Sequence, residues 1–187
     1  MRIVAGEFRG RELITPGGDK TRPTAARARE ALFSILRDVR AASVLDLYAG
    51  SGALALEALS RGAERAVFVE SSKAAQRAIQ TNVRALALEA RATLLPLRAE
   101  VALRALERHA PFTLVFADPP WADAQAALRV LQQLEAGLLL APAARLVFEH
   151  AARDTPNLPE NSRLHAIDAR RWGDTGVTIF EAGSTTS

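Results

Sequence analysis

Short apolar segments alternate with longer segments of helical apolar spacing from residue 43 onward, and this alternation restricts the chain to few folds. Parallel strands need a crossover to return to the same edge of a sheet, and that crossover is usually a helix. The alternation therefore predicts an α/β fold with a mostly parallel sheet and helices on both faces. We expect strands at 43–47, 66–70, 92–97, 113–117 and 145–149, and helices near 52–61, 73–87, 100–109, 123–137 and 139–142.

The two ends of the chain depart from this alternation. Strand-like segments at 163–170 and 177–181 are separated by a turn-rich stretch, which predicts a hairpin at one edge of the sheet. Residues 2–14 also alternate and contain a glycine turn, so we expect a short β-hairpin there, followed by a loop and a helix. We therefore divide the chain into an N-terminal appendage, 1–42, and a larger domain, 43–187.

Composition and charge narrow the class of protein. The chain has no cysteine, which excludes disulfides and cysteine-ligated metals, and we expect no metal site. It has no apolar stretch of membrane-spanning length and no signal peptide, so we expect a cytoplasmic monomer without membrane contact. The formal net charge is +3, and residues 1–40 hold nine Lys and Arg against five acids. This basic region indicates contact with a polyanion, and a solvated arginine-rich face is the alternative.

A glycine turn follows the first strand of the alternating region. Asp46 lies in that strand and precedes the turn, which contains Gly50 and Gly52. In open parallel sheets, ligands bind beyond the carboxyl ends of the strands, and glycines let the backbone approach them closely. Asp46 can accept a hydrogen bond from an ammonium group, and Glu70, at the end of the second strand, can hold ribose hydroxyls. This spacing alone fits either a dinucleotide or S-adenosylmethionine.

A second loop distinguishes between these two cofactors. Asp118 follows a buried strand and precedes Pro119 and Pro120, whose rings fix two φ angles and remove two N–H donors. The Asp118 carboxylate and the Pro119 carbonyl can then accept the two hydrogens of an exocyclic amine, while Trp121 can stack on the base that carries it. The loop therefore favours S-adenosylmethionine and methyl transfer to an amine of a base. An ordinary surface turn, with the tryptophan covering core, is the alternative.

Several motifs together resemble one family. They are residues 1–11, Arg22-Pro-Thr24, Arg27–Phe33, the glycine turn with residues 56–63, Asp118–Trp121 and Trp172–Thr175. From residue 1 to about residue 181, the chain is similar to the bacterial 16S rRNA (guanine(966)-N(2))-methyltransferases, a class I S-adenosylmethionine-dependent family. The central motifs occur in many amino-methyltransferases, whereas the N-terminal motifs are much more specific.

The resemblance implies a Rossmann-like fold whose seven-stranded, mostly parallel sheet has an antiparallel last strand. It implies S-adenosylmethionine as the donor and the N2 amine of a guanine in 16S rRNA as the acceptor, within the small ribosomal subunit or its assembly intermediate. The residues that it assigns are Asp118, Pro119 and Trp121 for catalysis; Asp46, Tyr48, Ala49, Gly50, Ser51, Gly52, Glu70, Ser71, Ala99 and Glu100 for the cofactor; and Arg2, Arg9, Arg11 and Arg22 for RNA. Family members often carry an acid after the third strand, a place that either Glu100 or the Ala99 N–H takes here.

Three other functions are alternatives. An N6-adenine DNA methyltransferase would use the same acceptor loop, but the chain has no separate base-recognition domain. A dinucleotide oxidoreductase would need a proton donor after the glycine turn, and no candidate residue follows the turn at a suitable position. An inactive RNA-binding module would need neither Asp118 nor Trp121.

Overall fold

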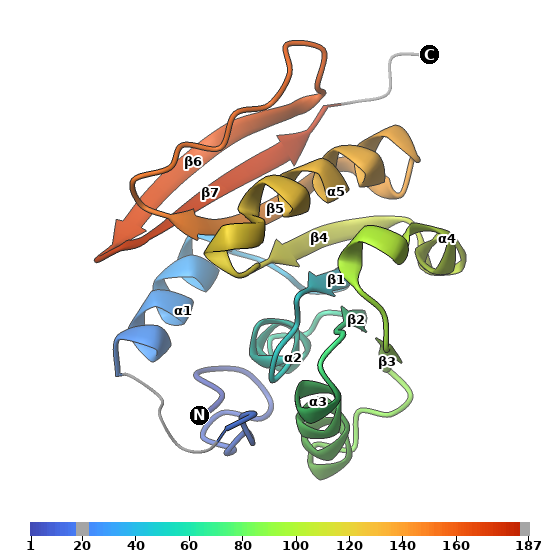
Figure 1. Cartoon of the computed structure of the whole chain (residues 1–187). Coiled ribbons are helices and arrows are strands. Elements are labelled where there is room, and N and C mark those ends of the chain that lie inside the picture. The colour runs from blue at the N-terminus through green and yellow to red at the C-terminus, as the bar shows by residue number, and fades with distance from the viewer. Residues whose placement is uncertain (18–22, 184–187) are drawn as a thin grey trace.

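A computed structural model describes residues 1–17 and 23–183. Its centre is a seven-stranded sheet with the strand order β3-β2-β1-β4-β5-β7-β6 (Figure 1). The strands are β1 (Ser43–Leu47), β2 (Arg65–Val69), β3 (Ala92–Leu95), β4 (Phe112–Ala117), β5 (Leu140–Ala151), β6 (Leu164–Trp172) and β7 (Thr175–Ala182). Strands β1 to β5 pair in parallel, and β7 is antiparallel to both β5 and β6. The predicted sheet, with its antiparallel last strand, is confirmed.

Helices cover both faces of this sheet. They are α1 (Pro23–Leu36), α2 (Ala53–Ser60), α3 (Lys73–Ala85), α4 (Leu103–Leu106) and α5 (Ala124–Ala136). Helices α1, α2 and α3 share one apolar core with one face of the sheet, where the rings of Phe33 and Phe116 lie 5.8 Å apart. Helices α4 and α5 share a second core with the opposite face. No helix in the described part of the chain is both long enough and apolar enough to cross a membrane.

The prediction of a helix over 139–142 is wrong, because residues 140–142 are the first residues of β5. The Phe112 N–H donates to the Leu139 carbonyl at 2.9 Å, and Phe112 pairs with Leu140. The register then shifts before Leu114 pairs with Arg145. A short apolar segment has no periodicity that separates helix from strand, so its pairing with β4 decides its conformation. The helix expected near 100–109 is also interrupted, since only α4 is α-helical and the flanking turns are 3₁₀.

The hairpin predicted for residues 2–14 is short: Arg2 and Glu12 form one antiparallel bridge, and beside it the N–H groups of Ile3 and Leu13 donate to the carbonyls of Arg11 and Met1 at 3.0 and 2.6 Å. Two of its backbone amides bind a side chain of α2 instead of a partner strand. Val4 N–H and Ala5 N–H donate to the two carboxylate oxygens of Glu57 at 2.8 and 2.9 Å. These amides cannot join a β-ladder while they bind the helix, so the segment is a turn-rich loop docked on α2.

Close packing on α2 explains a glycine in this N-terminal loop. Gly6 has a φ of +84°, and a Cβ there would lie 1.9 Å from the Ser60 carbonyl oxygen. Ile3 and Leu13 are buried in the same core cluster as α1, α2 and α3. The loop therefore packs as a layer against the sheet's covering helices.

Candidate active site

Four acidic side chains lie on one face of the sheet, near the carboxyl ends of four neighbouring strands. Side chains alternate between the faces along a strand, so each acid shares the face of the residue two positions before it. Those preceding residues all belong to the core that α1, α2 and α3 cover. The pairs are Phe68 and Glu70 after β2, Val44 and Asp46 on β1, Phe116 and Asp118 after β4, and Val147 and Glu149 on β5. Because these strands are adjacent, the acids form a row.

The acidic row is coupled electrostatically. Asp46 is buried, and its Oδ2 accepts a hydrogen bond from the Ala55 N–H at 3.3 Å. Burial raises the pKa of Asp46 well above its ordinary value, and the charges of Asp118 and Glu70 act in the same direction. A positively charged ligand at this edge would offset that mutual repulsion. The row therefore suits a cationic molecule.

Three residues of the glycine turn have a left-handed backbone conformation. Tyr48, Gly50 and Gly52 all have positive φ, at 60°, 56° and 77°. A Cβ at Gly52 would lie 3.0 Å from the Phe68 ring, so this glycine serves internal packing. A Cβ at Gly50 would meet nothing nearer than the Tyr48 carbonyl at 4.0 Å. Of these two glycines, only Gly50 therefore has open space where a side chain would lie.

Glu70 is held in place by backbone donors of two loops. Its Oε2 accepts from the Gly50 N–H at 2.8 Å, and its Oε1 accepts from the Ser72 N–H at 2.7 Å. Each oxygen keeps a further lone pair, so the carboxylate can still accept two hydroxyl groups. The predicted cofactor residue Ser71 is exposed in the loop between Glu70 and α3.

A second contact joins the glycine turn to the loop after β3. The Tyr48 hydroxyl donates to Glu100 Oε1 at 3.2 Å, and Arg98 Nε donates to Glu100 Oε2 at 3.2 Å. Partial burial raises the pKa of Tyr48, and the adjacent Glu100 charge adds to this effect. Ala99 is buried beside this pair. The predicted residues Tyr48, Ala99 and Glu100 are thus brought to the same edge.

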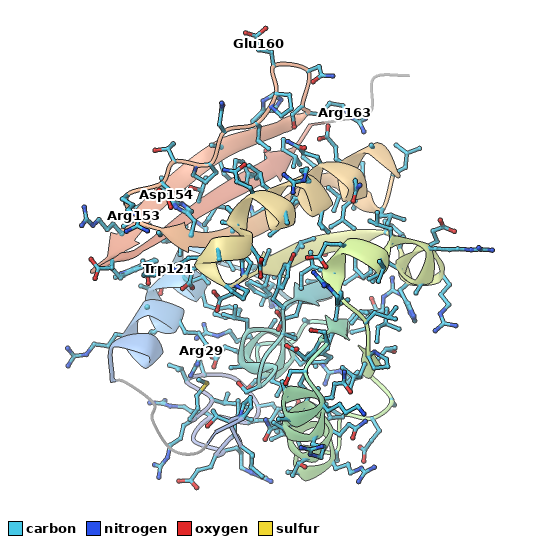
Figure 2. All side chains as sticks on the ribbon, viewed as in Figure 1. Arg29, Trp121, Arg153, Asp154, Glu160 and Arg163 are labelled. Carbon is cyan, nitrogen blue, oxygen red and sulfur yellow. The ribbon has the colours of Figure 1, made fainter. Side chains whose placement is uncertain are left out.

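The diproline loop leaves the sheet next to this edge. Asp118 is exposed to solvent, although much of the protein is packed around its carboxyl. The resulting desolvation raises its pKa to about 6. Pro119 is buried, whereas Trp121 is 46% exposed at the start of a 3₁₀ turn. Figure 2 shows Trp121 toward the same side of the molecule as Arg153, just beyond the carboxyl end of β5.

The predicted RNA-binding arginines differ in their contacts. Arg2 pairs with Glu12 at 2.7 Å, and Arg11 Nη2 donates to the Ala85 carbonyl at 2.6 Å. The exposed Arg9 side chain has no hydrogen bond or ion pair among the residues that the structure describes. Arg22 lies outside the described residues.

The sequence reasoning missed Glu149 as a site residue. Glu149 ends a predicted strand, the same signal that identified Glu70, but strand-end acids are common and no motif surrounds this one. Its half-buried carboxyl has a pKa raised to about 7, by desolvation and by the Asp118 charge.

Sequence comparison matches residues 1–181 to the model of a family described as conserved hypothetical protein 95. Ribosomal RNA small subunit methyltransferase D of Escherichia coli K12 is 35% identical over 171 residues, covering 88% of this chain and 82% of the relative. The Haemophilus influenzae protein of the same name is 32% identical over 167 residues, covering 88% and 86%.

A solved structure has the same architecture. Hypothetical protein TTHA0928 of Thermus thermophilus superposes with a TM-score of 0.79 at 34% sequence identity. The superposition covers 97% of this chain and 99% of that protein. The likeness therefore extends over the N-terminal segment as well as the sheet.

Proposed function

Because the chain belongs to the conserved hypothetical protein 95 family, we propose that it is an rRNA methyltransferase that uses S-adenosylmethionine. The finer proposal is transfer to the N2 amine of a guanine at the G966-type position of 16S rRNA. One observation supports it: β1 and β4 are parallel neighbours in which Leu47 pairs with Ala117, so the glycine turn and the diproline loop leave the sheet side by side. This placement is what a donor loop and an acceptor loop of one reaction require.

The residues at the glycine turn fit S-adenosylmethionine. Its cationic groups suit the acidic row, its ribose hydroxyls suit the fixed carboxylate of Glu70, and the open space beside Gly50 allows close approach. When bound, the cofactor supplies an electrophilic methyl group. We assign the cofactor site to Asp46, Tyr48, Ala49, Gly50, Ser51, Gly52, Glu70, Ser71, Ala99 and Glu100.

The diproline loop would hold the acceptor. The Asp118 carboxylate and the Pro119 carbonyl accept the two amine hydrogens, which directs the nitrogen lone pair away from the loop. Trp121, exposed at the start of its turn, stacks on the base. Asp118 also provides a place for the proton that the nitrogen loses after methylation. Positioning of this kind supplies most of the rate, since a sulfonium leaving group needs no strong base or metal.

The N-terminal segment would bind the RNA. In this proposal residues 1–42 are an RNA-binding appendage, 43–187 are the methyltransferase domain, and the protein is a cytoplasmic monomer acting on the small subunit or its assembly intermediate. Of Arg2, Arg9 and Arg11, only Arg9 is exposed with no side-chain hydrogen bond or ion pair within residues 1–17 and 23–183, so it can bind a phosphate without breaking a contact seen there.

Methylation of ribosomal subunits tests the proposed function. Purified protein, tritiated S-adenosylmethionine and small subunits from cells lacking the gene should yield N2-methylguanine in 16S rRNA. Nucleoside analysis of the digested RNA identifies the product. Label found only in DNA, or as N6-methyladenine, would replace this function with the adenine methyltransferase alternative.

Neutralising Arg9 should weaken RNA binding. We expect Arg9→Gln to lower the slope of log affinity against log salt by about one, the value for one lost phosphate contact. Arg11→Gln should have a similar effect if its guanidinium exchanges the Ala85 carbonyl for a phosphate. Filter binding of 16S rRNA across a salt series measures both slopes. Arg108→Gln is the control, because Arg108 follows α4 on the opposite face of the sheet from the N-terminal loop. An Arg9→Gln slope equal to wild type would show that the N-terminal arginines are only solvated.

A further inference from the structure

Asp118 and Glu149 occupy equivalent places on adjacent strands. Strands β4 and β5 are parallel, and Ala117 pairs with Phe148 in their register. Asp118 and Glu149 are the next residues on each strand. Neighbouring strands lie about 4.8 Å apart, and both side chains project to the face opposite Ala117 and Phe148. Two carboxylates therefore stand side by side at the proposed acceptor site.

This pair has no internal partner. Within residues 1–17 and 23–183, neither carboxylate makes a side-chain hydrogen bond or an ion pair. The other charged groups on this face of β1, β2 and β5 are two acids, Asp46 and Glu70, and one cation, Arg145. Arg145 lies four residues before Glu149, and its guanidinium donates to the Leu36 carbonyl and lies 4.0 Å from the Glu181 carboxylate. Desolvation raises the pKa of both members of the pair. Asp118 is exposed and Glu149 is half-buried, so the oxygens of both carboxylates are free to accept donors of a ligand.

The edges of the purine bases differ in the donors that they offer. The Watson–Crick edge of guanine carries two neighbouring donors, the N1–H and the N2 amine. Adenine places a lone pair at N1, which a carboxylate repels. Two adjacent acceptors, one for each donor, therefore match guanine and disfavour adenine.

On the basis of the proposed function, we propose that Glu149 accepts the N1–H of the target guanine while Asp118 holds its N2 amine. Glu149 is then the residue that selects guanine over adenine. The assignment also explains why a loop suited to any exocyclic amine would act on one base.

A base analogue separates the two hydrogen bonds. 2,6-Diaminopurine keeps the 2-amine but has a lone pair at N1. Small subunits would be reconstituted from ligated 16S rRNA with guanine or 2,6-diaminopurine at the methylated position. We expect wild-type kcat/KM to favour guanine by on the order of 100-fold or more, because a site built for a donor rejects an analogue that lacks it.

Glu149→Gln should reduce this preference. The amide can turn its NH₂ toward the N1 lone pair, so kcat/KM for guanine should fall about 10- to 100-fold while that for 2,6-diaminopurine holds or rises. Glu160→Gln, an exposed loop residue distant from Trp121 (Figure 2), should leave both values unchanged. S-adenosylmethionine affinity and thermal melting verify that the variant is folded.

The outcomes distinguish this inference from the proposed function. If wild type forms no N2-methylguanine, the proposed function fails. If wild type methylates both bases equally well, or if Glu149→Gln keeps the wild-type ratio, the function stands and the role of Glu149 is refuted. The wild-type ratio needs no variant, so instability of Glu149→Gln does not prevent the test.

Discussion

Turnover by the Asp118→Ala variant is expected to fall by about 10²- to 10⁴-fold, the range for loss of a positioned proton acceptor. The variant loses the carboxylate that orients the amine and receives its proton. Cofactor affinity should stay nearly unchanged, because the groups assigned to the cofactor, such as Glu70, are held by other loops. Single-turnover methyl transfer and calorimetric titration with S-adenosylmethionine measure the two quantities.

Asp38→Ala is the matched control for Asp118→Ala. Asp38 is exposed, pairs with Arg40 at 2.6 Å, and precedes β1 at the opposite end of the sheet. This variant should keep wild-type turnover. A parallel loss of turnover and cofactor affinity in Asp118→Ala would instead assign Asp118 to the donor site.

The wild-type pH profile should reflect the same carboxylate. Desolvation raises the pKa of Asp118 to about 6, so below that pH the group is protonated and accepts amine hydrogens poorly. We therefore expect kcat/KM to rise with pH between about 6 and about 7, as Asp118 and then Glu149, whose pKa is raised to about 7, lose their protons. The lower part of the rise should be absent in Asp118→Ala. A flat profile between pH 5 and about 8, measured with saturating cofactor, would contradict the assigned role.

Glu57→Ala is expected to lower the free energy of unfolding by about 3–5 kcal/mol, the range for removing one member of a buried ion pair. The Glu57 side chain is fully buried and accepts from Val4, Ala5 and Arg61, and Arg29 Nε lies 3.5 Å from its Oε2. Its loss leaves the buried Arg29 charge without this partner. Urea denaturation measures the change.

Glu30→Ala is the control for Glu57→Ala, because Glu30 is an exposed carboxylate on α1. It should change stability by less than about 1 kcal/mol. Amide exchange at Val4 and Ala5 should accelerate only in Glu57→Ala. If Glu57→Ala lowered the free energy of unfolding by less than about 1 kcal/mol, apolar contacts alone would be holding the N-terminal loop on α2.

Local sequence patterns predicted the structure correctly where the apolar periodicity and the turn residues gave a strong signal. Strand β1 coincides with its predicted range, and the predicted turn has positive φ at Gly50 and Gly52. Glu70 lies beside that turn as expected, bonded to the Gly50 N–H. The catalytic, cofactor and RNA roles stay predictions. Where local signals were weak, as at 139–142, pairing with β4 decided the structure.

The order of the five central strands and of the helices between them, apart from residues 139–142, could be predicted from local patterns, as could the glycine turn and the diproline loop. Each of these features depends on residues that are near one another along the chain. The position of Glu149 next to Asp118 could not be predicted in this way, because it depends on the register between β4 and β5. The tertiary structure likewise decided that Glu57 binds amides 52 and 53 positions away. The sequence around a single acidic residue does not indicate which group that residue will contact. The contact depends on how segments distant in the sequence pack together.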